Sequence, residues 1–431
     1  MSETNFSLPE GTHTVVLGMG DLNGIMRGKR IPASHWETIC KGGNALSIAL
    51  LAIDMTCDVW DTPYVNFDNG YPDMHMFPAR APMAMPWEPG VAIAIARAET
   101  MDHQPVPIDP RNVLIAQVKR AEAMGLTVNV GTELEFYLLD PETRQQKDQG
   151  IQVYGVERAA ELEHVLGPIR QQINEMGIPL EQSNPEYAAG QVEVNMRYDE
   201  ALLAADRVVM FRTLVKQLAH THGYMATFMS KPFFEQSGSG FHTHYSLWKD
   251  GRNQFADKGR LNAMGLNWIG GLQKRMSEMA LCSATTPNAY RRRQPFTFCP
   301  TNTAWGYDNR TVGLRVIEGA DSAVRVEKRD GSADCNPYLL LACEIAAGLD
   351  GIEQGIEPAA PVMGNAYEDE DAEALPTDLS TAVGLARGSD WLKGLIGDDL
   401  HEILCQQAER EIEFNAAQVT QVEVDRYLGN F

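Results

Sequence analysis

Pairs of glutamates stand on two segments whose alternating pattern predicts β-strands. GTELEF places Glu133 and Glu135 two residues apart, so a strand directs both carboxylates to one face. EYAAGQVEV places Glu186 before a tight turn and Glu193 after it, on another predicted strand. Carboxylates that converge in this way repel one another unless cations neutralise them, so the pattern predicts a site for divalent metal ions.

A third predicted strand adds imidazoles to this set. In FHTHYSLW, His242 and His244 share a face, and Ser246 follows on the same face. A single histidine of this kind is usually structural, but here it accompanies several carboxylates. Because most of the candidate ligands are hard oxygen atoms, the expected ions are Mg²⁺ or Mn²⁺.

The stretch VRVEKR, residues 324–329, places Arg325, Glu327 and Arg329 on one face of a fourth predicted strand. On its own it could be a surface ladder of ion pairs. Beside a metal site, however, arginines are suited to bidentate binding of phosphates and carboxylates. Further arginines occur in NAYRRRQP and NRTVGLR, namely Arg291, Arg292, Arg293, Arg310 and Arg315. Metal ions with several arginines predict phosphoryl transfer from ATP, although the chain has neither a GxxxxGK[ST] loop nor the protein-kinase motifs.

The segments that must position these side chains alternate between strands and helices. The expected strands are TVNVGTELEFYLL, QVEVNMRY and FHTHYSLW, and the expected helices between them are RAAELEHVLGPIRQQINEMG and ADRVVMFRTLVKQLAHTHG. A helix in IDPRNVLIAQVKRAEAMGL precedes them, with Asp109 as its N-cap, Pro110 at its first position and Gly125 just past its end. The tail from about residue 377 to 431 is predicted to be helical.

The first 107 residues are expected to be rich in β-structure. TVVLGMGDLNGIMRGKRIP predicts a hairpin that turns at 21–24, and VAIAIARAET predicts a buried strand. Residues 60–90, which are rich in proline, methionine and aromatic residues, predict long ordered loops.

Composition limits the class of protein. The chain has 431 residues, a formal net charge of −22 and 44% hydrophobic residues, as expected for a soluble protein of two or three domains. The acidic balance argues against nucleic acid and anionic membrane surfaces as partners, because both require a basic surface. Seven scattered cysteines without a CxxC pair indicate reduced thiols. No signal peptide and no apolar stretch of about 18 residues is recognisable, so we expect a cytoplasmic protein.

The combined motifs resemble the glutamine synthetase family nearly from end to end. The resemblance is carried, in chain order, by DLNGIMRGKRIP, GTELEF, EYAAGQVE, KPFFEQSGSGFHTH, NAYRRRQP, NRTVGLRV, VRVEKR and NPYLLLACEIAAGLDGI. It implies attack of the γ-carboxylate of glutamate on the γ-phosphate of ATP, followed by attack of a nitrogen nucleophile on γ-glutamyl phosphate. It also implies an α+β fold, with an N-terminal β-grasp domain (1–107) that completes the neighbouring subunit's site and a catalytic domain (108–431) built on an antiparallel sheet with helices. The implied assembly is a dodecamer of two hexameric rings.

The same resemblance implies roles for individual residues. One metal ion would be held by Glu135, Glu186 and Glu193. The metal ion that bridges to ATP would be held by Glu133, His242 and Glu327. The nucleotide would be lined by Glu181, His244, Ser246, Arg325 and Arg315. Phosphoryl transfer would be stabilised by Arg310 and Arg315. Substrate glutamate would be bound by Arg292 and Arg329, with Gly238 near its amino group.

The flap sequence PFTFCP departs from the family pattern. Glutamine synthetases carry a glutamate there that helps to bind ammonium and to accept its proton, whereas Phe298 is the aligned residue in this chain. A phenyl ring cannot accept a proton, but it can wall an apolar slot or hold a cation against its face. This departure argues against efficient use of ammonia.

With its aromatic flap residue, its AIDM segment and its NRTVGLRV sequence, the chain most resembles the γ-glutamylputrescine synthetase branch, which joins glutamate to a primary amine. Putrescine or another polyamine is therefore the favoured acceptor. The alternatives are a monoamine, ethanolamine or an aromatic amine, ammonia as in a glutamine synthetase that has kept its activity, and a non-catalytic ring. Aromatic residues between 60 and 87 could wall the acceptor pocket, namely Trp60, Tyr64, Phe67, Tyr71, Phe77 and Trp87.

The segment AIDMTCDVWD stands where the family places the aspartate that deprotonates ammonium in the neighbour's site. Asp54 is the best match, and Asp58 and Asp61 are nearby alternatives. A diamine acceptor would also favour a carboxylate deep in the amine pocket, for which the candidates are Asp58, Asp61 and Asp73. Tyr367 falls near a position that carries a regulatory tyrosine in some relatives, and we expect it to be an ordinary surface residue.

Overall fold

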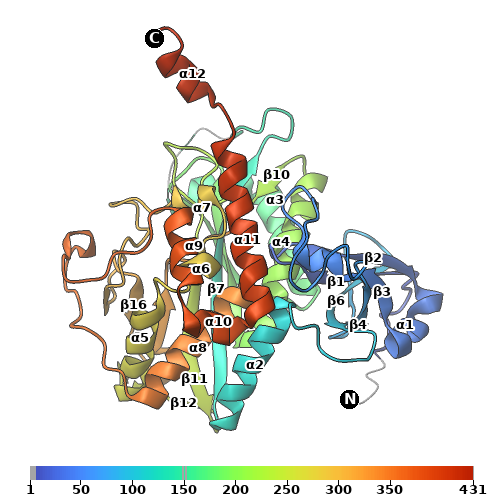
Figure 1. The fold of residues 1–431 in the computed structure, drawn as a ribbon, viewed down its shortest axis with the longest axis horizontal. Coiled ribbons are helices and arrows are strands. Elements are labelled where there is room, and N and C mark those ends of the chain that lie inside the picture. Colours follow the sequence, from blue (N-terminus) through green and yellow to red (C-terminus); the bar gives the residue numbers. More distant parts are fainter. Residues whose placement is uncertain (1–5, 148–149, 151–152, 431) are drawn as a thin grey trace.

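Two β-sheets organise the chain, and the computed structural model describes residues 6–147, 150 and 153–430 of it (Figure 1). The first sheet takes its strands from β1 to β6 and the second takes most of the remaining strands. The α+β fold expected from the sequence is confirmed. The predicted boundary at 107/108 falls between the last strand of the first sheet and the first long helix, and the division into domains remains a prediction.

The first sheet has six strands in the order β2-β1-β6-β4-β3, with β5 paired to β6. Its strands are β1 (Thr14–Gly20), β2 (Met26–Pro32), β3 (Asn44–Ser47), β4 (Asp73–Pro78), β5 (Met83–Ala84) and β6 (Val91–Glu99), and helix α1 (Trp36–Gly42) follows the first hairpin. β1 and β6 run parallel at the centre, and the outer pairs run antiparallel, as expected of a β-grasp sheet. The hairpin turn forms as predicted, because the Asp21 carboxylate accepts hydrogen bonds from the backbone N–H groups of Asn23 and Ile25.

The prediction that residues 60–90 form only loops was wrong. β4 and β5 lie inside this range. The sequence DMHMFP lacks the β-branched residues that usually mark a strand, but Met74 and Met76 are fully buried on one face of β4. The strand is therefore stabilised by buried methionines rather than by the β-branched residues from which strands are usually predicted.

The second sheet has nine strands in the order β15-β16-β17-β11-β7-β9-β8, with β10 paired to β7 and β12 to β11. Its strands are β7 (Thr127–Leu139), β8 (Leu180–Pro185), β9 (Gln191–Glu200), β10 (Met225–Thr227), β11 (Phe241–Lys249), β12 (Arg252–Asn253), β15 (Trp305–Tyr307), β16 (Leu314–Ile317) and β17 (Arg325–Lys328). A separate hairpin joins β13 (Ala256–Asp257) and β14 (Arg260–Leu261). All pairings in the nine-stranded sheet are antiparallel except that of β15 with β16.

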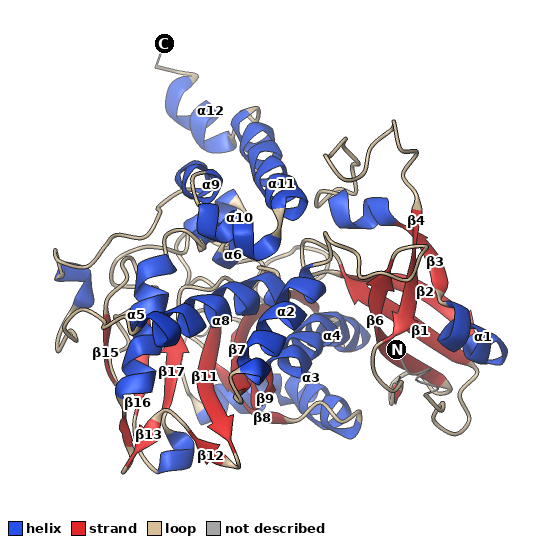
Figure 2. Ribbon diagram, turned by 60° about the horizontal axis from the view of Figure 1, so that its bottom comes forward, coloured by secondary structure: helices blue, strands red, loops and turns tan. Residues whose placement is uncertain are grey.

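This part of the chain also contains helices, and some of them cover one face of the nine-stranded sheet (Figure 2). The longer ones are α2 (Pro110–Ala123), α3 (Val156–Glu175), α4 (Ala201–Thr221), α5 (Ala263–Arg275), α8 (Pro337–Gln354) and α11 (Asp398–Ala416). The shorter ones are α6 (Ala280–Ser283), α7 (Pro287–Tyr290), α9 (Leu379–Arg387), α10 (Asp390–Ile396) and α12 (Gln421–Tyr427). Figure 2 shows α2, α4, α5 and α8 along the same side of the strands. None of the helices in the described part of the chain is long and apolar enough to cross a membrane.

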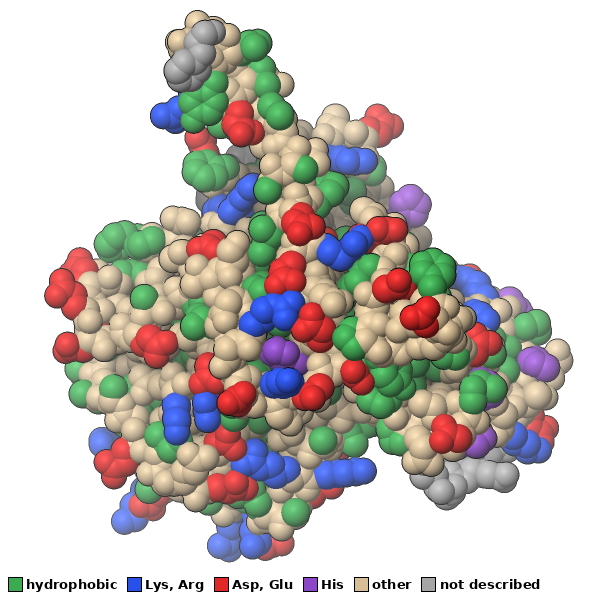
Figure 3. Space-filling view, in the orientation of Figure 1, with side chains coloured by type: hydrophobic (Ala, Val, Ile, Leu, Met, Phe, Trp, Pro, Cys, Tyr) green, Lys and Arg blue, Asp and Glu red, His purple; other side chains and the backbone are tan. Residues whose placement is uncertain are grey.

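The predicted ends of the helix that begins after Asp109 and the predicted helical tail are confirmed. Asp109 caps α2 by accepting from the N–H of Arg111, and Gly125 has a φ of 74° just past its end. The tail contains α9 to α12, and α12 projects from the body of the molecule (Figure 1 and Figure 3).

Asp206 joins the two sheets through a buried ion-pair cluster. This fully buried carboxylate on α4 pairs with Arg111 of α2 at 2.8 Å and with Arg80, which follows β4, at 2.7 Å. It also accepts from the hydroxyl of Tyr338 on α8 at 2.9 Å. Burial opposes ionisation of this carboxyl, but the nearby guanidinium of Arg111 holds its pKa below the ordinary value.

Replacing Asp206 by Asn should lower the free energy of unfolding by about 3–5 kcal/mol, because it leaves a buried guanidinium without its counter-charge. Urea denaturation followed by tryptophan fluorescence would measure the change. The matched control is Asp199→Asn, whose carboxylate pairs with Arg207 at a more exposed position. That change should cost less than about 1 kcal/mol. Equal costs for the two variants would show that the Asp206 cluster does not hold the sheets together.

Candidate active site

The strand register brings the predicted metal ligands together on the face of the sheet away from the helices. β7 lies between β9 and β11, and β17 lies next to β11. The facing pairs across these strands are Glu133 with His242, Glu135 with Glu193, and Glu327 with His244. Directly opposed residues project to the same face, so side chains from four strands share one surface.

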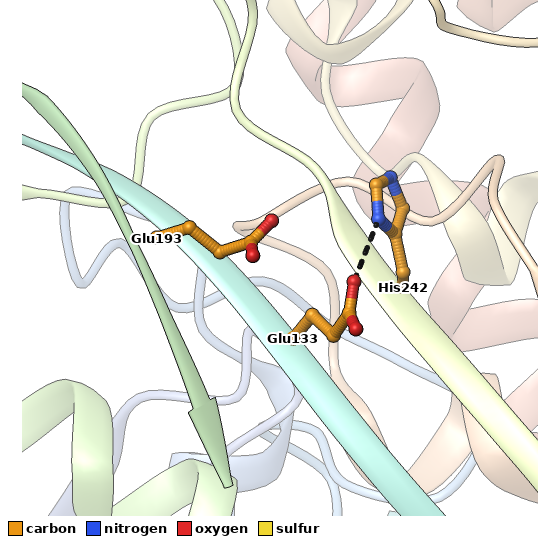
Figure 4. Close-up of side chains that lie close together, drawn as sticks. All are labelled: Glu133, Glu193 and His242. Atoms are coloured by element: carbon orange, nitrogen blue, oxygen red, sulfur yellow. Dashed lines mark ion pairs between the residues drawn. The ribbon is translucent and has the colours of Figure 1, made fainter. Parts of the chain in front are cut away.

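Glu133 is the centre of this surface. Its carboxylate lies 3.0 Å from Nε2 of His244 and 3.5 Å from Nδ1 of His242. Figure 4 shows Glu133, Glu193 and His242 directed toward one another from β7, β9 and β11. Two groups of ligand atoms lie within 4.8 Å of one another among the described residues: Glu133 with Glu193 and His242, and Glu133 with His244 and Glu327.

Glu327 is fully buried and accepts from two arginines. Arg329 pairs with it at 2.5 Å and Arg315 at 3.1 Å. Burial opposes ionisation of Glu327, but the guanidinium of Arg329, with smaller contributions from His244 and His242, lowers the pKa of Glu327 to about 2. The carboxylate is therefore ionised at neutral pH and is available as a metal ligand.

The carboxylates at the other end of the cluster lack such partners. Burial and then the Glu135 charge raise the pKa of Glu186 to about 7. Burial and then Glu133 raise the pKa of Glu193 above its ordinary value. Asn184 donates to Glu186 at 3.0 Å but brings no positive charge. This half of the site has more negative charge than the protein itself neutralises.

The donor set fits a hard divalent cation. Carboxylate oxygens from three strands and from Glu186, with one or two imidazole nitrogens, are ligands that Mg²⁺ or Mn²⁺ accept. A bound cation would supply the positive charge that Glu186 and Glu193 lack, and it would polarise phosphate oxygens. How the six predicted ligands divide between two ions remains a prediction.

Arg292 is buried beside the cluster. Its guanidinium donates to the backbone carbonyls of Arg329 and Asp330, at 2.9 and 3.2 Å. An added Cβ at Gly238 would lie 2.6 Å from Arg292, and one at Gly240 would lie 2.7 Å from it. The two glycines of GSGFH are therefore needed so that the backbone can approach this arginine closely.

The predicted nucleotide residues lie further along the same face. Arg325 Nε is 3.3 Å from Nδ1 of His244, and Ser246 accepts from Nε1 of Trp248 at 2.9 Å. The ring of Trp248 is stacked with that of Tyr198 at a centroid distance of 6.4 Å. Sequence analysis missed this pair, because Tyr198 and Trp248 are brought together only by the pairing of β7 with both β9 and β11. A flat aromatic pair beside Ser246 is suited to stacking against a nucleobase.

Phe298 lies at the edge of the site in a left-handed conformation, with a φ of 58°. Its ring contacts that of Tyr187 at a centroid distance of 5.8 Å, and its carbonyl accepts from Arg329 at 3.3 Å. Tyr367, which the sequence analysis expected to be an ordinary surface residue, is half-buried and donates to the Cys299 carbonyl at 3.1 Å. This hydrogen bond and the one from Arg329 fasten the flap at Phe298 and at the residue that follows it.

Three predicted site residues are placed elsewhere or left open to solvent. Glu181 and Arg310 are exposed. Asp54 accepts from the N–H groups of Thr56 and Asp58 in its own turn and lies 3.6 Å from Arg410 of α11. Their predicted roles, including that of Asp54 in a neighbouring subunit, remain predictions.

Lys328 supports β17 from the face opposite to the site. It is fully buried, and its ammonium group pairs with Glu344 of α8 at 2.9 Å and with Asp330. Glu344 also accepts from the hydroxyl of Thr243 on β11 at 2.8 Å. Sequence analysis did not identify this network, because its members are distant in sequence and each resembles an ordinary charged residue.

Comparisons with known proteins agree with this geometry. The model of the glutamine synthetase catalytic domain matches residues 107–427. A glutamate–isopropylamine ligase of Pseudomonas sp is 33% identical over 434 residues, which cover 96% of this chain and 95% of the relative. A γ-glutamylethanolamide synthetase of Streptomyces coelicolor is 35% identical over 432 residues, which cover 96% and 92%. The solved structure of GmaS with ADP superposes with a TM-score of 0.87 at 28% identity and covers 97% of both chains.

Metal binding at this site should depend on pH. Mn²⁺ should raise the thermal unfolding midpoint more at about pH 8 than at about pH 6, because the metal must displace protons from carboxyl groups whose pKa is raised, to about 7 for Glu186. Without metal, stability should fall as pH rises from the ordinary glutamate value of 4.5 through this range, since ionisation becomes costly only in the folded state. Differential scanning fluorimetry with and without MnCl₂ measures both effects.

The control for this prediction is Glu193→Gln. It removes one repelling carboxylate, so the metal-free midpoint at the higher pH should rise while the Mn²⁺-induced shift becomes smaller. A metal shift that is the same at both pH values, or the same in the variant, would contradict the assignment.

Proposed function

The chain belongs to the glutamine synthetase family, and we propose that it is an ATP-dependent ligase that joins the γ-carboxylate of glutamate to a primary amine, with putrescine or another polyamine as the favoured acceptor. The relatives named above are a ligase and a synthetase, and their names give isopropylamine and ethanolamine as the amines. One observation supports the proposal: Glu133, Glu193, His242, His244 and Glu327 gather in groups that could hold a cation, while an aromatic ring, Phe298, packs against Tyr187 at the flap.

The first step of the proposed reaction uses the arginines. The γ-carboxylate of glutamate attacks the γ-phosphorus of ATP, which breaks the bond to ADP and forms γ-glutamyl phosphate. Arg315 and Arg329 already lie against Glu327, so their guanidinium groups are placed where phosphate charge would develop next to a metal ligand. Bound Mg²⁺ or Mn²⁺ would neutralise the phosphate oxygens.

The second step depends on the flap. The neutral amine attacks the carbonyl carbon of γ-glutamyl phosphate, the carbon–oxygen bond to phosphate breaks, and the nitrogen gives its proton to the departing phosphate. Phe298 cannot take that proton, and its ring with that of Tyr187 gives an apolar wall instead of an ammonium cage. An amine with an alkyl substituent can bury that substituent against the two rings, whereas ammonium cannot.

Other acceptors remain candidates because of the relatives. A monoamine or ethanolamine would also fit an apolar wall, and the similarity to an isopropylamine ligase and an ethanolamide synthetase favours such substrates. A non-catalytic ring is disfavoured, since a dead site would have no use for carboxylates that repel one another. We further propose the family's assembly of two hexameric rings, with Asp54 completing the site of a neighbouring subunit.

Phosphate release from ATP, glutamate and Mg²⁺ tests the function directly. Putrescine, spermidine, ethanolamine, isopropylamine, aniline and ammonium should be offered separately. We expect release with putrescine to exceed release with ammonium by at least about tenfold in kcat/KM, because only the alkylamine gains contact with the aromatic wall. Phosphate release mainly with ammonium would make the protein a glutamine synthetase. If none of the acceptors causes phosphate release, the ligase function is rejected.

Substituting Phe298 by Glu should restore use of ammonium. The new carboxylate can pair with the cation and accept its proton, so the ratio of ammonium to amine in kcat/KM should rise by about ten- to a hundredfold. Phe298→Leu, which keeps an apolar side chain without a carboxylate, is the control. If both variants give the wild-type ratio, the flap residue does not determine the acceptor.

A further inference from the structure

A cavity of about 500 Å³ lies between the flap and the segment KPFFEQSGSG. It is lined by Tyr187, Lys231, Phe234, Glu235, Gln236, Ser237, Arg291, Gln294, Phe296, Thr297 and Phe298. Ammonium is about the size of water, whose share of liquid volume is about 30 Å³, so the cavity is far larger than an ammonia site requires. Its size fits an amine with several carbon atoms.

One wall of the cavity connects it to the metal ligands. Tyr187 directly follows Glu186, and its ring contacts that of Phe298 at 5.8 Å. An acceptor whose reacting nitrogen lies at the Glu186 end would therefore place its carbon chain along these two rings. Residues 234–237 line the same cavity, so the far end of that chain would lie among residues that include them.

Glu235 is the one acidic group among the described residues that line this cavity. It is exposed, and it takes part in no ion pair among the described residues. The two cations of the lining do not neutralise it: Lys231 donates to the backbone carbonyl of Gln236, and Arg291 is exposed to solvent. Burial lowers the pKa of Lys231.

Of the three aspartates that the sequence suggested for the second charge of a diamine, Asp73 is exposed on β4 and does not line this cavity, and the other two are already engaged. Asp58 pairs with Arg410 at 2.6 Å. Asp61 accepts from the hydroxyl of Tyr71 at 2.8 Å and from the N–H of Phe67 at 3.0 Å. Glu235 has no such partner and borders the same cavity as the flap ring.

We propose that Glu235 binds the distal ammonium group of a diamine acceptor and so determines the preference for a diamine over a monoamine. The inference rests on the proposed ligase function and adds a specificity residue to it. The reacting nitrogen, the carbon chain and the second ammonium would then meet the metal-ligand end, the Tyr187–Phe298 wall and Glu235 in turn.

The test compares putrescine with n-butylamine, which has the same carbon chain and lacks only the second ammonium group. Glu235→Gln keeps the shape of the side chain and removes its charge. It should lower kcat/KM for putrescine about five- to tenfold and leave kcat/KM for n-butylamine within about twofold of wild type. Glu142→Gln changes an exposed glutamate that does not line the cavity and should alter neither value.

The outcomes separate this inference from the proposed function. The proposed role of Glu235 is supported if the wild-type enzyme uses both amines and the Glu235→Gln variant loses activity only with putrescine. Equal loss of both amines would show that Glu235 acts on the reacting nitrogen or on the fold, and no loss of either would remove it from the acceptor site. A wild-type enzyme that prefers n-butylamine would overturn the inference while leaving the amine ligase intact. If the wild-type enzyme is inactive with both amines and with all the other acceptors named above, the ligase function itself is rejected.

Discussion

Electrostatic repulsion within one patch of sheet is the constraint that the surrounding structure has to satisfy. Glu133, Glu135 and Glu193 lie on two adjacent strands, and Glu327 lies two strands away with β11 between them. The arginines that pair with Glu327 compensate one side of the patch, whereas Glu186 and Glu193 keep a raised pKa on the other. Such a surface is stable only on a rigid support and is best balanced by cations from outside the protein.

That support is a strand with charge on both of its faces. β17 presents Glu327 to the site, and on its other face Lys328 is held between Glu344 and Asp330. A buried ion pair of this kind adds little net stability, but breaking it is costly because the remaining charge has no partner. The helix α8 therefore fixes the position of β17, and with it the two arginines of the VRVEKR segment that flank the site. Asp206 plays the corresponding part between the two sheets.

The sequence predicted well those features that depend on residues close together in the chain. Alternation along TELEF and FHTH was sufficient to place Glu133, Glu135, His242 and His244 on one face, and the cap at Asp109 follows from local preference. Features that depend on distant pairing were not accessible. The Tyr198–Trp248 stack and the buried pairing of Lys328 require the strand order, and no local pattern distinguishes them. Strand β4 was missed for another reason, since methionine carries little strand preference and is buried there by packing alone.

The left-handed backbone at Phe298 affects how readily an enzyme of this kind could change its preferred acceptor during evolution. With a φ of 58°, every side chain other than glycine, asparagine or aspartate meets a comparable steric penalty, and only β-branched residues fare much worse. Exchange of one unbranched residue for another there is therefore nearly neutral for folding, while it alters the chemistry at the acceptor wall. The fastening of the flap by backbone carbonyls, at Phe298 to Arg329 and at Cys299 to Tyr367, does not depend on that side chain either. Descendants of one ancestral ligase could thus have diverged in nitrogen source by single substitutions at this position, without first acquiring a stabilising change elsewhere.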